Sequence, residues 1–345
     1  MKKRISFLTA ILLTFVLVFS ACGGQTSSTS DSGGEEAKQD NGKTYVFKVG
    51  HSLPEDHPYQ LSLEKLNEAV QERTNGKVKF ELYPSSALGA ERELTEALTL
   101  GTIDMAISST GPISNFYKDM GVVDLPYLFS GREHAYKVLD GEIGQELLQG
   151  LESVGIIGLA WGENGIRHIT NAKHPIKSPA DLQGLKIRTM ENPVHMAAFE
   201  ALGAKPTPMA WTEALTALQQ GVVDAQENPA IVADQFMLYE ANQKYMTLTG
   251  HVYSPAIYMF SKAVWDTLPS DIQQIIKEET KKAADYEREL IVQMEQDSLE
   301  VLKEKGVEII ENVDITPFRE AIKPVYDKYG ETFGQDLINH IIYTQ

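Results

Sequence analysis

Apolar residues recur with two different periods along most of the chain. In some stretches apolar and polar positions alternate, which indicates strands, and in others the apolar residues are three or four positions apart, which indicates helices. The predicted strands fall at 45–49, 78–82, 103–107, 156–161, 185–190 and 222–226, with helices around 59–75, 94–101, 132–152, 193–202 and 211–220. This repeated order of strand and helix predicts an α/β fold with a mostly parallel sheet.

One short sequence pattern occurs twice. Residues 97–104 and 217–224 both read Ala-Leu-x-x-Gly-x-x-Asp, and both run from the end of a predicted helix into a predicted strand. Junctions of helix, glycine and strand also converge on such sequences without any repeat. Because the second copy coincides with a second pass of strands and helices, we expect two similar α/β lobes with a cleft between them.

The C-terminal part of the chain is predicted to be strongly helical. Apolar residues keep a helical spacing from Ser270 to Lys305, and no Pro or Gly interrupts this stretch. A helix of that length exceeds the diameter of one small domain. We therefore expect it to run across both lobes as a shared strut, followed after Gly306 by one more strand and a short helical tail.

The first 21 residues have the pattern of a secretory signal peptide. Met1–Arg4 is positively charged, and the apolar stretch after it is too short for a comfortable membrane span. Small residues precede Cys22, which resembles a bacterial lipoprotein cleavage box, so we expect Cys22 to become the lipidated first residue. The alternative is an ordinary signal peptide with an incidental cysteine. Residues 22–43 are small, polar or acidic apart from that cysteine, and are expected to form a flexible tether.

Charge and composition exclude several classes of function. The formal net charge is −17, whereas nucleic-acid binding needs clustered Lys and Arg, so an anion site has to be local. Cys22 is the one cysteine, so the folded part has no disulfide, thiolate metal site or cysteine nucleophile. The eight histidines form no metal-binding pattern, and the sequence contains neither a phosphate-binding glycine-rich loop nor a nucleophile elbow. We expect no metal and no cofactor.

Three polar clusters lie at or just after the carboxyl ends of predicted strands. They are residues 163–167 (Glu-Asn-Gly-Ile-Arg), Arg188 and residues 226–229 (Gln-Glu-Asn-Pro). In open α/β sheets, ligands bind in crevices at the carboxyl ends of strands. Arg167 and Arg188, together with the amide of Asn228, suit a small carboxylate, because a guanidinium binds a carboxylate through two parallel hydrogen bonds.

Each of these residues also has a plainer interpretation. Arg188 alone fits a surface ion pair, and Trp211, at the start of a predicted helix, fits either an apolar wall of the cleft or a core aromatic. Glu163 and Glu227 are the acids that a glycosidase-like enzyme would place in the cleft, although most such acids are structural. A secreted enzyme acting on acidic sugars is therefore an alternative function, and a ligand sensor that docks on a receptor kinase is another.

Seven motifs occur in one order between Tyr45 and the C-terminus. They are 82–89 (LYPSSxLG), 101–104 (GxID), 124–129 (DLPYLF), 164–167 (NGxR), 181–188 (DLxGLKIR), 206–209 (PTPM) and 226–229 (QENP). Together they resemble the extracytoplasmic solute-binding subunit of TRAP transporters, the family first associated with C4-dicarboxylates. The resemblance implies a two-lobed periplasmic-binding-protein-like fold with a ligand cleft between the lobes. Lobe I would hold residues 44–164 plus 254–293, and lobe II residues 165–253 plus 294–345.

The resemblance also implies roles for single residues. Arg188 matches the arginine that clamps the ligand carboxylate, Asn228 an asparagine that assists it, and Arg167 a second arginine of the cleft. Ser109 matches a position that is acidic in the sialic-acid-binding branch, which speaks against sialic acid. The other residues expected to bind ligand are Glu91, Arg92, Glu163, Trp211 and His51.

The implied function is capture and delivery, in which no bond is made or broken. The cleft would enclose an organic acid, either a C4-dicarboxylate or a sugar acid such as a hexuronate, and pass it to the TRAP membrane subunits. The protein would lie outside the cytoplasm, anchored by its lipid to the outer face of the cell membrane, or in the periplasm of a cell with two membranes.

Overall fold

The computed structural model describes residues 42–344. The predicted signal peptide, Cys22 and the tether up to residue 41 lie outside the described residues. Within residues 42–344, no helix has the length and apolar character needed to cross a membrane.

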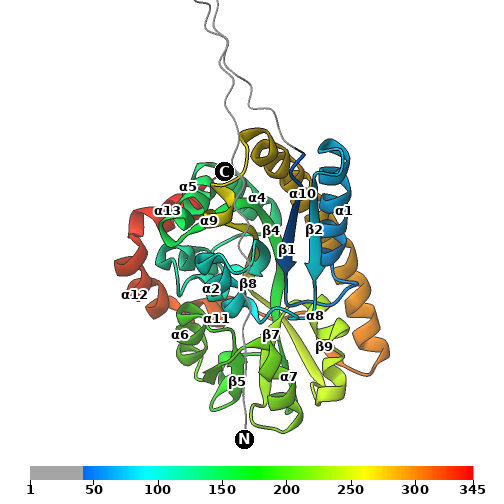
Figure 1. Ribbon diagram of the computed structural model, residues 1–345. Coiled ribbons are helices and arrows are strands. Elements are labelled where there is room, and N and C mark those ends of the chain that lie inside the picture. The colour runs from blue at the N-terminus through cyan, green and yellow to red at the C-terminus, as the bar shows by residue number, and fades with distance from the viewer. Residues whose placement is uncertain (1–41, 345) are drawn as a thin grey trace, which may run out of the picture. The chain divides into compact units, whose positions relative to one another are not determined.

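Nine strands of the described part form one sheet (Figure 1). They are β1 (Tyr45–Gly50), β2 (Val78–Tyr83), β3 (Met105–Ser109), β4 (Ile156–Asn171), β5 (Lys186–Thr189), β6 (Lys205–Pro208), β7 (Ala225–Asn228), β8 (Tyr245–Ser261) and β9 (Glu308–Ile310). Their order across the sheet is β2-β1-β3-β8-β4-β7-β5-β6, with β9 beside β8. Both ends of the sheet are parallel, as predicted, but β8 and β4 in its middle pair antiparallel with each other and with β3 and β7. The sheet is therefore mixed.

The two long central strands, β4 and β8, are largely missing from the hydrophobic pattern. The pattern predicts only the beginning of β4, and it does not predict β8 at all. Nearly all residues of both strands are buried, because helices cover the two faces of the sheet, so apolar and polar positions do not alternate along them. The polar cluster 163–167 therefore lies inside β4. The prediction that this cluster follows the end of a strand is wrong.

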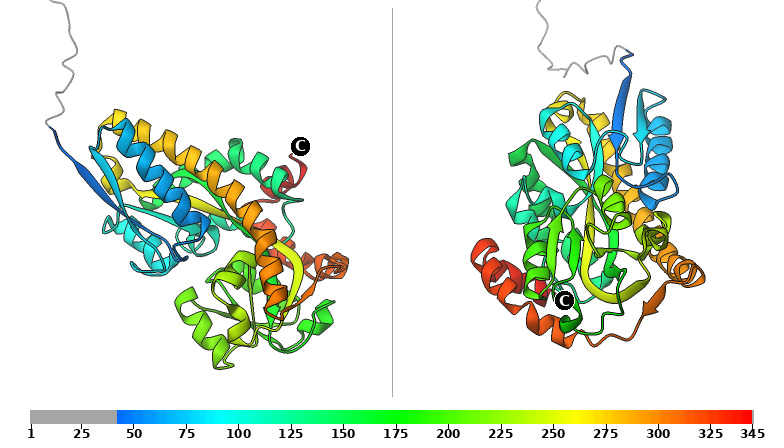
Figure 2. Two further views of the ribbon diagram at one scale, coloured as in Figure 1. Left: turned by 90° about the vertical axis from the view of Figure 1, so that its right-hand side faces the viewer. Right: turned by 90° about the horizontal axis from the view of Figure 1, so that it is seen from below.

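Helices cover the sheet in two lobes, seen most clearly in the left view of Figure 2. The first lobe carries β1–β3 with α1 (Pro58–Arg73), α2 (Glu91–Leu100) and α3 (Thr110–Ile113), and the second carries β5–β7 with α6 (Pro193–Ala201), α7 (Trp211–Gln219) and α8 (Ala230–Gln235). The α-helices after β8 are α9 (Lys262–Trp265), α10 (Ser270–Glu304), α11 (Thr316–Ala321), α12 (Lys323–Phe333) and α13 (Gln335–Tyr343). Helix α10 packs on α1 and on α8, so the prediction of a long helix spanning both lobes is confirmed.

The single helix predicted at 132–152 is wrong in one respect. It is two helices, α4 (Arg132–Asp140) and α5 (Glu142–Gly150), and the chain becomes extended at Gly141 between them. A Cβ atom at Gly141 would lie 2.8 Å from the Lys137 carbonyl oxygen, so this close approach favours glycine.

The repeated pattern Ala-Leu-x-x-Gly-x-x-Asp has the same structure in both lobes. Gly101 ends α2 with a φ of 70°, and Gly221 follows α7 with a φ of 68°, a left-handed conformation that glycine adopts without strain. Asp104 then accepts a hydrogen bond from a backbone N–H of β1 at 2.7 Å, and Asp224 accepts one from β5 at 3.3 Å. The repeat therefore marks equivalent junctions of two similar lobes.

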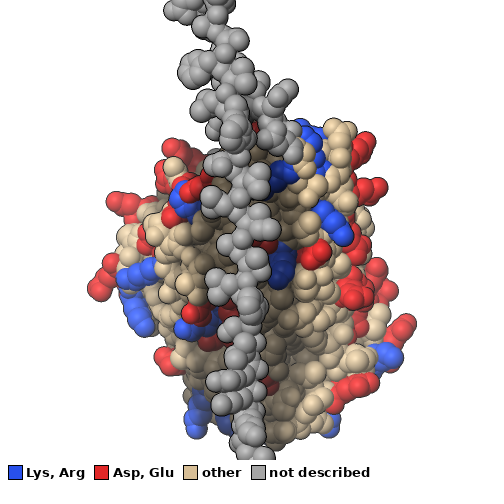
Figure 3. All heavy atoms as spheres, in the orientation of Figure 1, with Lys and Arg blue, Asp and Glu red and all other residues tan. Residues whose placement is uncertain are grey.

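Charged side chains are mixed on the face shown in Figure 3. Lys and Arg groups lie between Asp and Glu groups, mainly along the outer parts of that face, and uncharged atoms form most of the rest. The visible part of this face offers no broad basic surface.

Candidate functional site

Side chains from both lobes meet in one cavity, which we call the interlobe cavity. It is lined by Ser52, Leu53, Glu91, Ser109, Asn164, Arg167, Arg188, Met190, Trp211, Asn228 and Val232. Its volume is about 20 Å³, room for about one water molecule, and its arginines are almost completely buried. The structure therefore shows the lobes closed, and an organic acid enters this cavity only when they move apart.

Arg188 is a buried cation in β5, the next-to-last residue of that strand. Its Nε and Nη2 atoms donate to the carbonyl oxygen of Met209 at 3.1 and 2.8 Å, and its guanidinium lies 5.3 Å from the centre of the Trp211 ring. No carboxylate among residues 42–344 forms an ion pair with it. Burial lowers the pKa of Arg188 to about 10, so the group stays charged at neutral pH. A carboxylate placed beside it would complete its hydrogen bonding and balance its charge.

Arg167, by contrast, is fully occupied by protein partners. Its Nη2 atom donates to Glu227 Oε1 at 2.8 Å, its Nε atom donates to the other carboxylate oxygen, and its Nη1 atom donates to Asn164 at 3.0 Å. Burial by itself raises the pKa of Glu227, but the charge of Arg167 and the hydrogen bonds from His251 and Arg167 outweigh burial and leave that pKa below its ordinary value. Arg167 and Glu227 therefore form a neutral, bidentate pair in the cavity wall.

A second carboxylate faces the cavity from the first lobe. Glu91 begins α2, and its two oxygens accept hydrogen bonds from the backbone N–H and the hydroxyl of Ser109, each at 2.8 Å. Burial raises the pKa of Glu91, although these two hydrogen bonds lower it. Each carboxylate oxygen can accept a further hydrogen bond, so Glu91 suits a ligand that carries hydroxyl groups.

Trp211 and Asn228 complete the second-lobe side of the cavity. Trp211 begins α7, the place equivalent to Glu91 in α2, and its ring packs edge-on against Phe236 with the centroids 4.9 Å apart. Trp211 therefore serves both as a core aromatic and as a cavity wall, the two interpretations that the sequence leaves open. The side-chain amide of Asn228 donates to Gln226 at 2.7 Å, which fixes the orientation of its carbonyl oxygen.

The chain matches the family described as "Bacterial extracellular solute-binding protein, family 7" over residues 49–332. The chain belongs to this family. It is 38% identical over 298 residues to the 2,3-diketo-L-gulonate-binding periplasmic protein YiaO of Escherichia coli, covering 86% of this chain and 90% of the relative. The resemblance to TRAP solute-binding subunits is thereby confirmed, and the family and its solved members are binding proteins, not enzymes.

Two solved structures of TRAP solute-binding proteins have the same fold. One, from Polaromonas sp. JS666 and bound to D-erythronate, is 42% identical with a TM-score of 0.85, covering 87% of this chain and 99% of that one. Another, from Sulfitobacter sp. NAS-14.1 with bound β-D-galacturonate, is 32% identical with a TM-score of 0.84, covering 87% and 100%. The two-lobed fold with its interlobe cleft is therefore that of TRAP solute-binding proteins.

The structure brings six of the nine predicted ligand-binding side chains of this TRAP protein into the interlobe cavity: Arg188, Asn228, Arg167, Glu91, Ser109 and Trp211. Glu163 lies elsewhere, where its carboxylate pairs with Arg132 at 2.7 Å and accepts a hydrogen bond from Tyr136. His51 is buried beside Gln60, with its Nε2 atom 3.0 Å from the amide oxygen.

Arg92 lies on the surface and does not line the cavity. Its guanidinium pairs with Glu191 at 3.1 Å, and the Arg92 side chain is 47% exposed. Glu163 and Glu227 are the acids that a glycosidase-like site would use. Each is bound to a different arginine, Glu227 to Arg167 and Glu163 to Arg132, so they do not act as a pair.

Five cavity residues were not predicted from the sequence: Ser52, Leu53, Asn164, Met190 and Val232. Two of them had a usable signal. Asn164 is part of the motif at 164–167. Met190 is two residues after Arg188, and an extended chain places the side chains of Arg188 and Met190 on the same side. Ser52 is next in sequence to His51, which was predicted, whereas Leu53 and Val232 are apolar and gave no signal for a polar site.

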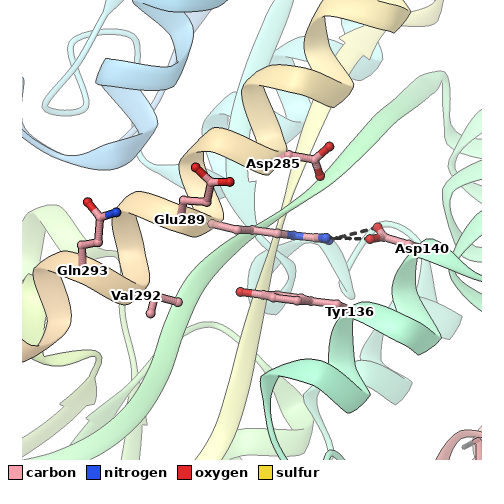
Figure 4. A pocket seen from close by; sticks show the side chains of 7 residues that line it. Tyr136, Asp140, Asp285, Glu289, Val292 and Gln293 are labelled. Carbon is pink, nitrogen blue, oxygen red and sulfur yellow. Dashed lines mark hydrogen bonds and ion pairs between the residues drawn. The ribbon is translucent and has the colours of Figure 1, made fainter.

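A surface groove between α4 and α10 has a volume of about 460 Å³ (Figure 4). Arg288 lines it and donates to Asp140 at 2.8 and 3.2 Å, and the guanidinium carbon of Arg288 lies 4.5 Å from the centre of the Tyr136 ring. Asp285 and Glu289 also line this groove. Because its arginine is already paired and its other charges are acidic, the groove does not suit an organic acid.

Proposed function

We propose that this chain captures a polyhydroxy monocarboxylic acid, such as a sugar acid, in the interlobe cavity and delivers it to TRAP membrane subunits. Arg188 holds the ligand carboxylate, and the oriented carbonyl oxygen of Asn228 and the carboxylate of Glu91 accept hydrogen bonds from ligand hydroxyls. One observation carries this proposal: Arg188 is a charged, buried guanidinium whose hydrogen bonds to residues 42–344 go to a carbonyl oxygen and not to a carboxylate.

The charges around the cavity favour one carboxylate over two. Arg167 is neutralised by Glu227, which leaves Arg188 as the cation that a ligand can pair with, and Glu91 contributes no positive charge. A second ligand carboxylate would be desolvated beside Glu91 without a cation of its own, at a cost of several kcal/mol. The charges therefore argue against a C4-dicarboxylate. The acids named for the three relatives, 2,3-diketo-L-gulonate, D-erythronate and β-D-galacturonate, each carry one carboxylate and several oxygen substituents.

The mechanism is capture by closure. The cavity draws its lining from both lobes, so a ligand that enters between separated lobes makes its full set of contacts only when the lobes close on it. Binding shifts the population toward this ligand-bound closed form, in which the ligand keeps the cavity wider than it is in the empty protein. The membrane subunits then recognise this closed form. We infer lobe boundaries at 44–164 plus 254–293 and 165–253 plus 294–345, because β4 and β8 cross the sheet centre between these segments.

The N-terminal segment completes the proposal. We infer that residues 1–21 are removed as a signal peptide, that Cys22 carries the lipid anchor, and that residues 22–43 tether the binding lobes to the outer face of the cell membrane. The supporting features are the charged and apolar stretches of the N-terminus and the position of the one cysteine at the cleavage edge.

Calorimetric titration against a panel of acids tests the proposed ligand class. We expect D-erythronate, D-galactonate or D-galacturonate to bind at least about tenfold more tightly than succinate and L-malate, a difference of about 1.4 kcal/mol. The hydroxyl groups matter as well as the charge, so propionate serves as a control with one carboxylate and no hydroxyl. Succinate binding more tightly than every hydroxy monocarboxylate would contradict the charge argument.

A further inference from the structure

Three consecutive residues of the second lobe, Met190–Asn192, each contact the first lobe; we call them the strap. The strap directly follows β5, the strand that carries Arg188, and leads into α6. Met190 lines the interlobe cavity, and its sulfur lies 3.3 Å from the hydroxyl oxygen of Ser109. Its methyl group also fills the space beside Gly111, where an added Cβ would lie 2.6 Å from it.

Glu191 makes the contacts at the rim of the cavity. Its carboxylate pairs with Arg92 of α2 at 3.1 Å, and its carbonyl oxygen accepts a hydrogen bond from the Asn115 side chain. Arg92 and Glu191 each follow a residue that lines the cavity, so their ion pair lies next to the cavity wall, with side chains 47% and 26% exposed.

Asn192 makes the buried contact. Its side-chain oxygen caps α6 by accepting from the backbone N–H groups of Val194 and His195 at 2.8 and 3.0 Å. Its amide nitrogen donates across to Asp124 at 2.8 Å and to the carbonyl oxygen of Gly111 at 3.3 Å. Asn192 and Asp124 are both fully buried, so these hydrogen bonds join the lobes in a place that water does not reach in the closed form.

We propose that the strap is a closure latch, in which Glu191 and Asn192 are positioning residues that hold the lobes closed around the ligand without touching it. Residue Arg188 and the strap are one short stretch of chain, so the group that receives the ligand carboxylate and the groups that lock the lobes move together. This inference rests on the proposed use of the interlobe cavity as the binding site. It adds that the free protein has an intrinsic closed population set by residues outside that site.

The polar character of the latch suits repeated opening. When the lobes separate, water hydrates Asp124, Asn192 and Glu191, so each hydrogen bond lost is replaced and the net preference for closure stays small. Ligand affinity then depends on the closed fraction, because the apparent dissociation constant rises as the binding-competent fraction falls. Weakening the latch therefore weakens binding without altering any ligand contact.

Two kinds of variant separate the latch from its structural surroundings. Asn192→Ser keeps an oxygen that caps α6 but loses the amide that donates to Asp124. Arg92→Glu places two negative charges together at the exposed rim, where the fold tolerates substitution, and adding Glu191→Arg restores an ion pair with its charges reversed. The double variant is the matched control for the single one.

Distances between spin labels measure the latch directly. In the full chain with Cys22→Ser, Leu100→Cys and Val222→Cys place one label on each lobe, at residues that are 68% and 54% exposed. Pulsed electron paramagnetic resonance of the ligand-free protein should show the closed distance at least about threefold less populated in Asn192→Ser and in Arg92→Glu. The reversed pair should restore the parent distribution.

Distance distributions identical to the parent in both single variants would overturn the latch. The latch would also be overturned if adding Glu191→Arg to Arg92→Glu did not restore the distance distribution of the parent. Because these distances are measured without any acid, they test the latch independently of the ligand class. If no acid of the calorimetric panel bound to the protein, the proposed function would be contradicted, but the distances measured in the ligand-free protein would still test the latch.

Discussion

Arg188→Ala is expected to weaken binding of the ligand by about 30-fold to 4,000-fold, which corresponds to about 2–5 kcal/mol. The physical reason is that the variant leaves the ligand carboxylate desolvated in a closed cavity without its cation. Arg167 does not substitute for the lost charge, because both of its carboxylate-facing nitrogen atoms are bound to Glu227. Calorimetric titration with the tightest acid of the panel measures the change.

Two controls show whether the loss belongs to the guanidinium itself. Arg188→Lys keeps the charge but not the planar fork, so its affinity should fall between those of the parent and of Arg188→Ala. Arg319→Ala removes an arginine that stacks over Tyr127 outside the cavity and should leave affinity unchanged. Unchanged affinity in Arg188→Ala, with a melting temperature like that of the parent, would remove Arg188 from the site.

Glu227→Gln is expected to lower the free energy of unfolding at pH 7 by about 3–5 kcal/mol. The side chains of Arg167 and Glu227 are both fully buried. The exchange therefore leaves the guanidinium of Arg167 away from water and without a carboxylate partner. Urea unfolding at equilibrium measures the loss. Replacing both residues, with Arg167→Met and Glu227→Leu, should recover a large part of it, because no unpaired charge then remains buried.

The same pair makes the loss depend on pH. The pKa of Glu227 is lower in the folded chain than its value of 4.5 in the unfolded one, because the charge of Arg167 and two hydrogen bonds outweigh burial. Its contribution to stability is therefore fully present above pH 4.5 and is lost as the pH falls through the lowered folded pKa. The stability difference between parent and Glu227→Gln should shrink on acidification, whereas equal stability at pH 7 would show that the pair contributes nothing.

The meeting of Arg167, Arg188 and Asn228 could be predicted from the sequence, although part of the reason was wrong. Arg188 and Asn228 lie at or next to the ends of β5 and β7, where the strand rule expects ligand residues. Arg167 instead lies inside β4, which continues through the polar cluster because Glu227 on the neighbouring strand β7 neutralises its charge. A hydrophobic pattern does not reveal such a buried ion pair, so the strand predicted from that pattern ends too early.

The three predicted residues outside the cavity share one cause. Glu163, His51 and Arg92 are each next in sequence to a residue that does line it, namely Asn164, Ser52 and Glu91. Neighbouring side chains point to opposite faces of a strand and about 100° apart on a helix, so a local motif locates the segment but not which of two adjacent side chains faces the ligand. Only the packed lobes decide that.

A crystal structure of this protein with the tightest-binding acid of the panel tests the role of Arg188 most directly. We expect one ligand carboxylate bound by the guanidinium of Arg188 within about 3.2 Å, with ligand hydroxyls on Asn228 or Glu91 and the lobes closed. A carboxylate held by other residues, while Arg188 makes no contact with the ligand, would show that Arg188 is not the carboxylate-binding residue.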